Sequence, residues 1–299
     1  MHKSLREKPR MKTTLIRALA AIVAAAGFAM TAGSALAAGD HVPIESWPSE
    51  RGRDLVSLQN GARLFANYCL GCHSANLVRW NLLQQIGLDD RQIKDFLIFG
   101  DQKVGDNIRI AMAPADAKAW FGKTPPDLSV ITRARTSFEF AGTDYIYTLL
   151  RGYYRDNSTP TGWNNIAYPN IGMPHIFWDR QGPREATLVE VHRNADAKSG
   201  PASYVQTTTV FDVDGNATKT QTEVKPPVAE GVTHSFKPVD AHQAREFDSD
   251  VADLVAFLQF ITDPSRSRRV QIGVWVLVFL GLFTIAAWRL NAVYWKDIK

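Results

Sequence analysis

The sequence predicts a mainly α-helical fold with an inserted β-ribbon and one C-terminal transmembrane helix. Three observations support this fold class. Apolar residues recur at helical spacing over residues 57–69 and 251–261. β-Branched residues concentrate between 187 and 236, and an uncharged, largely apolar run extends from 270 to 288. A chain of 299 residues with a hydrophobic fraction of 45% has room for one or two domains and a membrane segment.

The first predicted helix covers residues 57–69. One face of this helix repeats at helical spacing through Leu58, Ala62, Phe65 and Cys69. Gly61 weakens the middle of the helix, and we expect another helix to approach the backbone closely at this point.

Capping residues mark the start of three further helices: Asp89, Thr143, and either Asp248 or Ser249. The second of these helices ends at Gly152, and the third ends at Asp263-Pro264. Residues 153–180 are rich in Asn, Pro, Gly and aromatic side chains, and they predict an irregular loop.

The segment 187–236 predicts a β-ribbon. Its β-branched stretches are 187–191 and 204–211, and Asp214-Gly215-Asn216 is a turn signal. No chemical motif is evident in this insertion. Residues 270–288 predict a transmembrane helix, because 19 residues at the helical rise extend for about 28 Å.

The first 38 residues have the organisation of a bacterial secretory signal. A basic region precedes an apolar run at 19–30, and small residues at 35–37 predict cleavage after Ala37 or Ala38. A retained anchor helix is the alternative, although this apolar run is short for a membrane span.

Export and the C-terminal span together predict the topology. Residues 39–264 would form the main domain in the periplasm. Residues 265–299 would form a single-pass anchor in the bacterial inner membrane and a short cytoplasmic tail. Basic residues flank the span on both sides, so the orientation is inferred from the secretory signal rather than from the positive-inside rule.

The net charge of +4 is unevenly distributed. Residues 1–38 and 265–299 each contain six basic residues and one acidic residue, which leaves 22 basic and 28 acidic residues in 39–264. A main domain with a net charge of −6 does not indicate a nucleic-acid partner. An acidic surface favours docking of a basic protein or serves solubility alone.

Cys69-Leu70-Gly71-Cys72-His73 has the C-x-x-C-H spacing of c-type haem attachment. Each thiol can form a thioether to one haem vinyl group, and the adjacent imidazole can bind the iron as proximal ligand. Both cysteines of the chain lie in this motif, which predicts one covalently bound haem c and excludes a second haem of this type. The helical part of the fold is therefore predicted to be a c-type cytochrome domain.

Two other kinds of site use a C-x-x-C pair. A thioredoxin-like redox pair follows a β-strand, and none is evident before Cys69. A zinc site needs further ligands at metal spacing, and the chain has no second cysteine pair. The adjacent His73 and the export signal favour covalent haem over both alternatives.

The sixth ligand of the iron decides between electron transfer and the binding of small molecules. Outside the secretory signal, only Met112 and Met173 offer a thioether, and His175 offers a second imidazole. Met173 lies between Gly172 and Pro174, in a loop that can hold a thioether rigidly. Spacing favours Met173 but excludes neither alternative, because a methionine can simply fill core space.

The motifs, in their order along the chain, resemble those of the cytochrome c1 family, the haem subunits of quinol–cytochrome c oxidoreductases (cytochrome bc1 complexes). The motifs lie at residues 69–74, 125–129, 133–135, 144–145 and 171–174, followed by a single span. Met173 is followed directly by Pro174 where many members have Met-Ala-Pro. The long insertion at 187–236 is a second departure.

The resemblance implies roles for individual residues. Met173 would be the sixth ligand beside His73, and Met112 would not bind the iron. Arg135 would lie by a haem propionate, and Tyr145 would line the haem pocket. Pro126 would lie against the haem.

The resemblance also implies a function in the respiratory chain. The protein would carry electrons from a Rieske iron–sulfur protein to a soluble cytochrome c, together with a cytochrome b, without bond chemistry of its own. Two alternatives are a haem enzyme or sensor with an open sixth site, and a monohaem subunit of another membrane redox complex. Binding of CO and the identity of co-purifying subunits distinguish these three functions.

Overall fold

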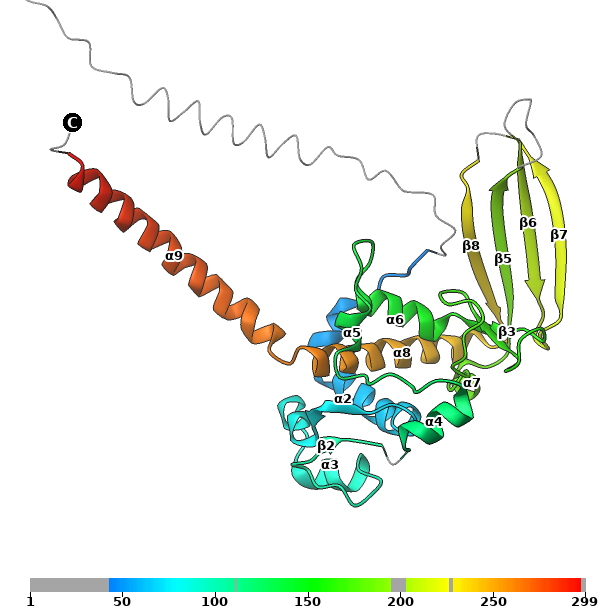
Figure 1. Ribbon diagram of the computed structural model, residues 1–299, viewed down its shortest axis with the longest axis horizontal. Coiled ribbons are helices and arrows are strands. Elements are labelled where there is room, and N and C mark those ends of the chain that lie inside the picture. Colours follow the sequence, from blue (N-terminus) through cyan, green and yellow to red (C-terminus); the bar gives the residue numbers. More distant parts are fainter. Residues whose placement is uncertain (1–42, 111, 195–202, 226–227, 297–299) are drawn as a thin grey trace, which may run out of the picture. The chain divides into compact units, whose positions relative to one another are not determined.

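The computed structural model describes residues 43–110, 112–194, 203–225 and 228–296 (Figure 1). The predicted signal peptide, residues 1–38, lies outside the described residues. The α-helices are α2 (Leu55–Leu64), α3 (Asp90–Phe96), α4 (Pro114–Phe121), α5 (Ile131–Ala134), α6 (Gly142–Arg151), α7 (Trp178–Gln181), α8 (Ala241–Thr262) and α9 (Arg266–Tyr294). The described residues also form two short 3-10 helices, η1 (Ser49–Arg53) and η3 (Trp80–Ile86), and the π-helical turn η2 (Phe65–Cys69).

The strands form three antiparallel groups. The two small groups are β1 (Ala75–Arg79) with β2 (Asn107–Ile108), and β3 (Tyr153–Arg155) with β4 (Trp163–Asn165). The third group has the order β7-β6-β5-β8, from β5 (Arg184–Arg193), β6 (Tyr204–Phe211), β7 (Ala217–Val224) and β8 (Gly231–Pro238). Helices are more extensive than strands, as the sequence predicts.

Helices α2 and α8 pack against each other at the centre of the main domain. A Cβ atom on Gly61 would lie 2.1 Å from the carbonyl oxygen of Asp253 and 2.7 Å from Cβ of Phe257. The expected close approach at Gly61 is thus confirmed, because no larger side chain fits between the two helices. The main core surrounds this contact and includes Leu64, Phe65, Leu254, Val255 and Phe257.

The first helix begins two residues earlier than the apolar pattern indicates. The Asp54 carboxylate accepts hydrogen bonds from the backbone N–H groups of Val56 and Ser57 and caps α2. The predicted start at Asp89 is confirmed, because Asp89 and Gln92 form a reciprocal capping box at α3.

The cap predicted at Thr143 is wrong. Helix α6 begins at Gly142, and Thr143 is buried inside its first turn. A Cβ on Gly142 would lie 1.8 Å from the carbonyl oxygen of Thr132, so the contact with α5 requires glycine at this helix start. Gly152 follows the end of α6, as predicted.

The predicted start of the last globular helix, at Asp248 or Ser249, is also wrong. Helix α8 begins at Ala241, and the Asp240 side chain accepts hydrogen bonds from the backbone N–H groups of His242 and Gln243. Asp248 lies in the helix interior and pairs with Arg151. An acidic residue that resembles a cap in the sequence is therefore used in a tertiary ion pair. The helix ends at Thr262, before Pro264, as predicted.

The insertion is a four-stranded sheet rather than a ribbon, and it extends from Arg184 to Pro238. Strand β5 is central, since Leu188 pairs with Thr209 of β6 and with His234 of β8. A small second core joins the sheet to the β3–β4 hairpin: Tyr154, Ile166, Ala186 and Phe211. The predicted irregular loop at 153–180 therefore contains regular structure, namely that hairpin and helix α7.

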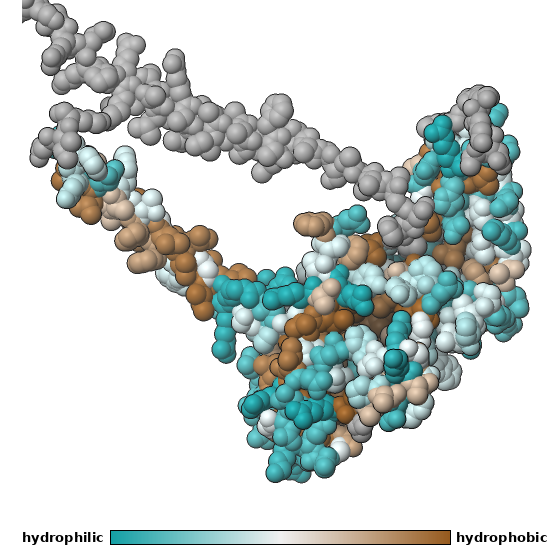
Figure 2. Space-filling view, viewed as in Figure 1, coloured by the Kyte–Doolittle hydropathy of each residue, from teal (hydrophilic) through white to brown (hydrophobic). Residues whose placement is uncertain are grey.

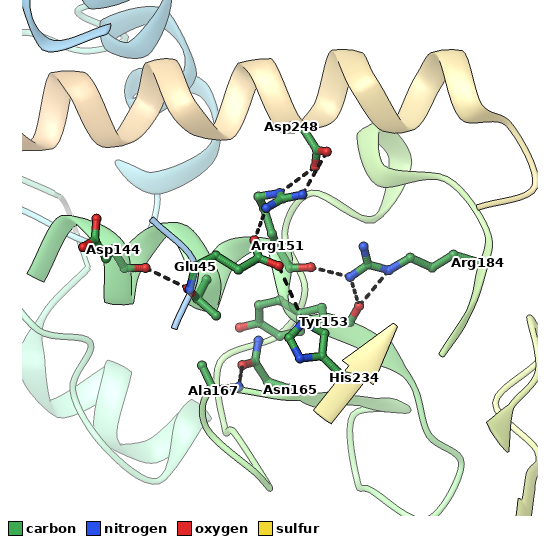
Figure 3. Close-up of polar contacts among 10 residues, drawn as sticks. Glu45, Asp144, Arg151, Tyr153, Asn165, Ala167, Arg184, His234 and Asp248 are labelled. Atoms are coloured by element: carbon green, nitrogen blue, oxygen red, sulfur yellow. Dashed lines mark hydrogen bonds and ion pairs between the residues drawn. The ribbon is translucent and has the colours of Figure 1, made fainter. Parts of the chain in front are cut away.

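A network of charged side chains joins the sheet to the helical domain (Figure 3). Arg151 of α6 pairs with Glu45 and also with Asp248 of α8, at 2.6 Å from Nε to Oδ1. His234 of β8 lies 3.5 Å from the Glu45 carboxylate. Arg184 of β5 donates to the carbonyl oxygens of Arg151 and Tyr153. Residues that are distant in the sequence are therefore held together by Arg151.

Replacing Arg151 with alanine is expected to lower the free energy of unfolding by about 2–3 kcal/mol, because two partly buried carboxylates lose their partner. Chemical denaturation of the haem-loaded protein in detergent measures the loss. Arg91→Ala is the matched control. Its ion pair with Asp95 has side-chain exposures of 90% and 51%, so a loss below about 0.5 kcal/mol is expected. Equal losses in the two variants would contradict this assignment.

The C-terminal helix α9 contains the predicted span. The span Arg268–Tyr294 comprises 27 residues. Its most apolar window of 18 residues has a mean hydropathy of 2.2, and none of that window is buried by the rest of the protein. Apolar side chains dominate the middle of this helix, and paler or hydrophilic residues are visible toward its ends (Figure 2). At the helical rise, 27 residues extend for about 40 Å, which is sufficient to cross a bilayer. This helix fits a single-pass membrane anchor.

Candidate haem site

A largely apolar cavity gathers side chains from stretches that are distant in the sequence. Cys69, Cys72 and His73 line it, together with Met173. Other side chains that line the cavity include Lys123, Pro126, Arg135, Tyr145, Tyr168, Leu254 and Leu258. The cavity therefore contains every residue that the sequence analysis assigned to the haem site.

The end of the first helix positions the two thiols. The α2–α8 contact fixes α2, which continues into η2 and ends at Cys69. The backbone N–H groups of Cys72 and His73 both donate to the carbonyl oxygen of Cys69, at 3.0 and 2.9 Å. Burial raises the pKa of Cys69 to about 12. A thiol held in its protonated form is unlike the reactive thiolate of a thioredoxin-like pair.

The His73 ring is held in one tautomer. Its Nδ1 lies 2.7 Å from the carbonyl oxygen of Pro126. Because a carbonyl oxygen only accepts hydrogen bonds, Nδ1 carries the proton and Nε2 keeps its lone pair. Burial lowers the pKa of His73 and favours the neutral ring. A neutral imidazole oriented through its second nitrogen is typical of a metal-binding histidine.

Asp127 ties the Pro-Pro-Asp-Leu-Ser segment to the chain that follows His73. Its carboxylate accepts hydrogen bonds from the Ser74 hydroxyl at 2.9 Å, from the Asn76 backbone N–H at 2.7 Å, and from the Ser129 backbone N–H at 2.9 Å. A backbone bond of 2.8 Å from Leu128 to Ser74 runs between the same two stretches. This arrangement explains how the carbonyl oxygen of Pro126 is held beside the imidazole.

Met173 lines the cavity from the loop between β4 and α7, and its side chain is partly buried against the main core. The Tyr153 hydroxyl donates a hydrogen bond of 3.1 Å to the carbonyl oxygen of Met173. This bond links the loop to strand β3. It restricts the backbone that carries the thioether.

The other two candidate ligands are not among the described residues that line the cavity. Met112 precedes α4 and contributes to neither the cavity lining nor the main core. His175 is only 3% exposed and stacks on the Tyr153 ring, with centroids 4.5 Å apart. Burial lowers the pKa of His175 to about 3, so this ring is neutral. It packs as a core residue behind the loop of Met173.

Arg135, Tyr145 and Pro126 all line the cavity, as expected from the resemblance. The Arg135 guanidinium lies 5.8 Å from the centre of the Tyr145 ring, and Phe140 stacks on the same ring at 5.6 Å. Desolvation raises the pKa of Tyr145, which keeps its hydroxyl protonated. Arg133 differs from Arg135, because it pairs with Asp263 at 3.6 Å.

The chemistry of these residues fits haem c. Two thiols at the attachment spacing, one imidazole with a free Nε2 and one thioether line the same cavity. The apolar surface comes from α5, α6 and α8 and includes Ile131, Leu149, Leu254 and Leu258. The cationic Arg135 suits a carboxylate-bearing ligand.

Three residues that shape this site have roles that the sequence motifs do not predict. Asp127 and Tyr153 act through hydrogen bonds to residues far along the chain, and no sequence spacing reveals such partners. Lys123 lines the cavity but lies just outside the Pro-Pro-Asp-Leu-Ser motif. A positively charged residue three positions before Pro126 was the available signal.

Comparisons with known proteins agree with a c-type haem site in this cavity. The model of the Cytochrome C1 family matches residues 51–298. A protein named cytochrome c1 from Allochromatium vinosum is 36% identical over 82% of this chain and 86% of its own length. Cytochrome c1 from Rhodospirillum rubrum is 27% identical, over 97% of this chain and all of the relative.

A relative with a different name is about as similar. The ammonia monooxygenase gamma subunit of Nitrosomonas europaea is 35% identical over 87% of this chain and 91% of its own length. The family match covers most of the chain and includes the attachment motif, the Met173 loop and α9. The chain therefore belongs to the cytochrome c1 family, the membrane-associated c-type haem subunits of bc1-like complexes, and carries one covalently bound haem c.

Proposed function

We propose that this chain carries single electrons from a Rieske iron–sulfur protein to a soluble cytochrome c. The observation that supports this function best is the joint lining of one cavity by His73 and Met173. Histidine and methionine together are the ligand pair of electron-transfer c-type cytochromes and raise the haem potential. When bound, haem c supplies an iron that alternates between the ferric and ferrous states.

Each residue of the site has a distinct part in this proposal. Cys69 and Cys72 would form the thioether links, and His73 and Met173 would bind the iron. The Pro126 carbonyl oxygen accepts the Nδ1 proton of His73 and keeps Nε2 available to the iron. Two further residues that line the cavity would contact the haem edge: Arg135 and Tyr145.

The proposed topology follows from the secretory signal and the span. Residues 1–38 are removed on export, residues 39–264 lie in the periplasm, and 265–299 form the anchor and a short cytoplasmic tail. This orientation places the haem on the same side of the membrane as a soluble cytochrome c. The net charge of −6 of the main domain suits a basic electron acceptor.

Purification of the complex through a tag on this chain tests the proposed partners. We expect a cytochrome b and a Rieske protein to co-purify. Rapid mixing with quinol should then reduce the haem of this chain before the added cytochrome c. Electron transfer to cytochrome c should slow as salt is added, because exposed charges are screened over about 8 Å at physiological ionic strength. Co-purification with oxidase subunits would instead support a different redox complex.

CO distinguishes the carrier from an enzyme or sensor with an open sixth site. With a thioether on the iron, the reduced wild-type haem should not bind CO at neutral pH. Rapid and complete CO binding to native protein would contradict the proposed function.

A further inference from the structure

We propose that Lys123 is a second carboxylate-binding residue of the haem cavity, which pairs with one haem propionate and favours the reduced state of the haem. This inference rests on the proposed function. It assigns a role to a residue outside the motifs that carry the family resemblance.

The charged side chains that line the cavity support this pairing of Lys123 with a propionate. Among the described lining residues, the only side chains with a permanent positive charge are Lys123 and Arg135, and none is acidic. Haem c has two propionate carboxylates. A carboxylate at the edge of an apolar cavity requires a partner or water, because burial of an unpaired charge is costly. Two cations and two carboxylates therefore match in number and in sign.

No ion pair among the described residues involves Lys123, so its ammonium group can pair with a propionate. Ion pairs within the described residues use other side chains, such as Arg133 with Asp263. The ammonium group of Lys123 lies 6.0 Å from the centre of the Tyr168 ring, and Tyr168 also lines the cavity. The ring face attracts the ammonium group and favours its position beside the cavity.

The position of Lys123 also relates it to the proposed sixth ligand. A Cβ atom built on Gly172 would lie 3.7 Å from Cε of Lys123, and Gly172 immediately precedes Met173. The lysine stem therefore packs beside the loop that presents the thioether. Gly122, which precedes Lys123, has a φ of +74° and ends α4. This left-handed residue turns the chain from the helix into the Lys123–Pro126 segment that lines the cavity.

The sign of the electrostatic effect is fixed. Oxidation adds one positive charge to the haem, so a nearby cation makes oxidation less favourable and raises the midpoint potential. The same cation favours the ionised propionate and lowers the pKa of that carboxyl group. Without Lys123, the propionate would take up a proton at a higher pH. The pH range over which the potential varies would move upward.

The other titratable groups that line the cavity do not produce this signature. Tyr145 is protonated through the measured range, because desolvation raises its pKa. His73 would be bound to the iron, and its Nδ1 proton is donated to Pro126. Tyr68, Tyr168 and Arg135 also line the cavity. All three are the same in the wild type and in Lys123→Gln, so they do not account for a difference between the two proteins.

Redox titration of Lys123→Gln between pH 5 and pH 9 tests the proposal, with the wild type measured beside it. We expect a lower midpoint potential and an upward movement of its pH-dependent range. Lys123→Arg should restore both properties, since it keeps the charge. Lys118→Gln is the matched control: Lys118 is exposed on α4, is absent from the cavity lining, and should behave as the wild type. The difference between Lys123→Gln and wild type should shrink in high salt.

Ligation of the iron is followed in the same samples, so that the two proposals can fail separately. An unchanged near-infrared sulfur–iron band in Lys123→Gln, with a lowered potential, supports the pairing. A wild-type potential and pH profile in Lys123→Gln would overturn the role of Lys123 and leave the electron-carrier function intact. An equal decrease of the midpoint potential in Lys123→Gln and Lys123→Arg would also overturn the role of Lys123, because the arginine keeps the positive charge.

Discussion

Replacing Met173 with leucine is expected to convert the haem from an electron carrier into a ligand-binding haem. Leucine has nearly the same volume but no sulfur, so the iron would lose its sixth ligand while the loop kept its packing. We expect the midpoint potential to fall by on the order of 100 mV or more, because axial ligands set haem potentials over a range of about 0.8 V. The reduced variant should bind CO. Redox titration and CO difference spectra measure both effects.

Met112→Leu is the matched control for this prediction. Met112 offers the same thioether but is not among the described residues that line the cavity. We expect this variant to keep the wild-type potential and to exclude CO. The opposite pattern, with Met112→Leu losing potential and Met173→Leu unchanged, would require another arrangement of the loop before α4. His175→Phe separates the third candidate, and it should retain the wild-type sulfur–iron band.

Replacing Gly61 with alanine is expected to destabilise the protein strongly, although the change adds only one methyl group. The new Cβ would lie 2.1 Å from the carbonyl oxygen of Asp253, which is backbone and cannot rotate away. The two helices would have to separate. We expect the free energy of unfolding to fall by about 3 kcal/mol, with a decrease of about 6–12 °C in melting temperature. Thermal unfolding of the haem-loaded protein, followed by haem absorption, measures the effect.

The consequence should extend to the haem site, because α2 leads directly into η2 and Cys69. We expect less haem to be attached to Gly61→Ala during expression. Gly100→Ala is the matched control. A Cβ on Gly100 meets no atom within 4 Å, so its melting temperature and haem content should equal those of the wild type. Equal melting temperatures for the two variants would show that the helices can separate without cost.

Local chemistry explains why part of the site was predictable from the sequence. The attachment motif needs two thiols and an imidazole at fixed spacing, and the sequence contains all three within five residues. Gly61 was recognisable because glycine weakens a helix unless a close contact requires it. The span of α9 was recognisable because an apolar run of that length has few other uses.

Long-range contacts explain what the sequence did not predict. Asp248 is a residue type that often caps helices, but its side chain instead binds Arg151, which is 97 positions away in the sequence. The choice among Met112, Met173 and His175 depended on which side chains share a cavity with His73. Strand β8 lies beside β5 in the sheet, although β6 and β7 lie between them in the sequence. The turn at 214–216 indicates only the β6–β7 pair, which is half of the sheet.

The near-infrared absorption of the oxidised wild-type protein in detergent tests the central claim most directly. That claim is that the iron is bound by His73 and Met173. The weak sulfur–iron band reports a methionine ligand without any mutation, and Met173→Leu identifies which methionine supplies it. We predict the band in the wild type and its loss in Met173→Leu. A wild-type spectrum without the band, or a Met173→Leu spectrum that keeps it, would contradict the proposed ligation.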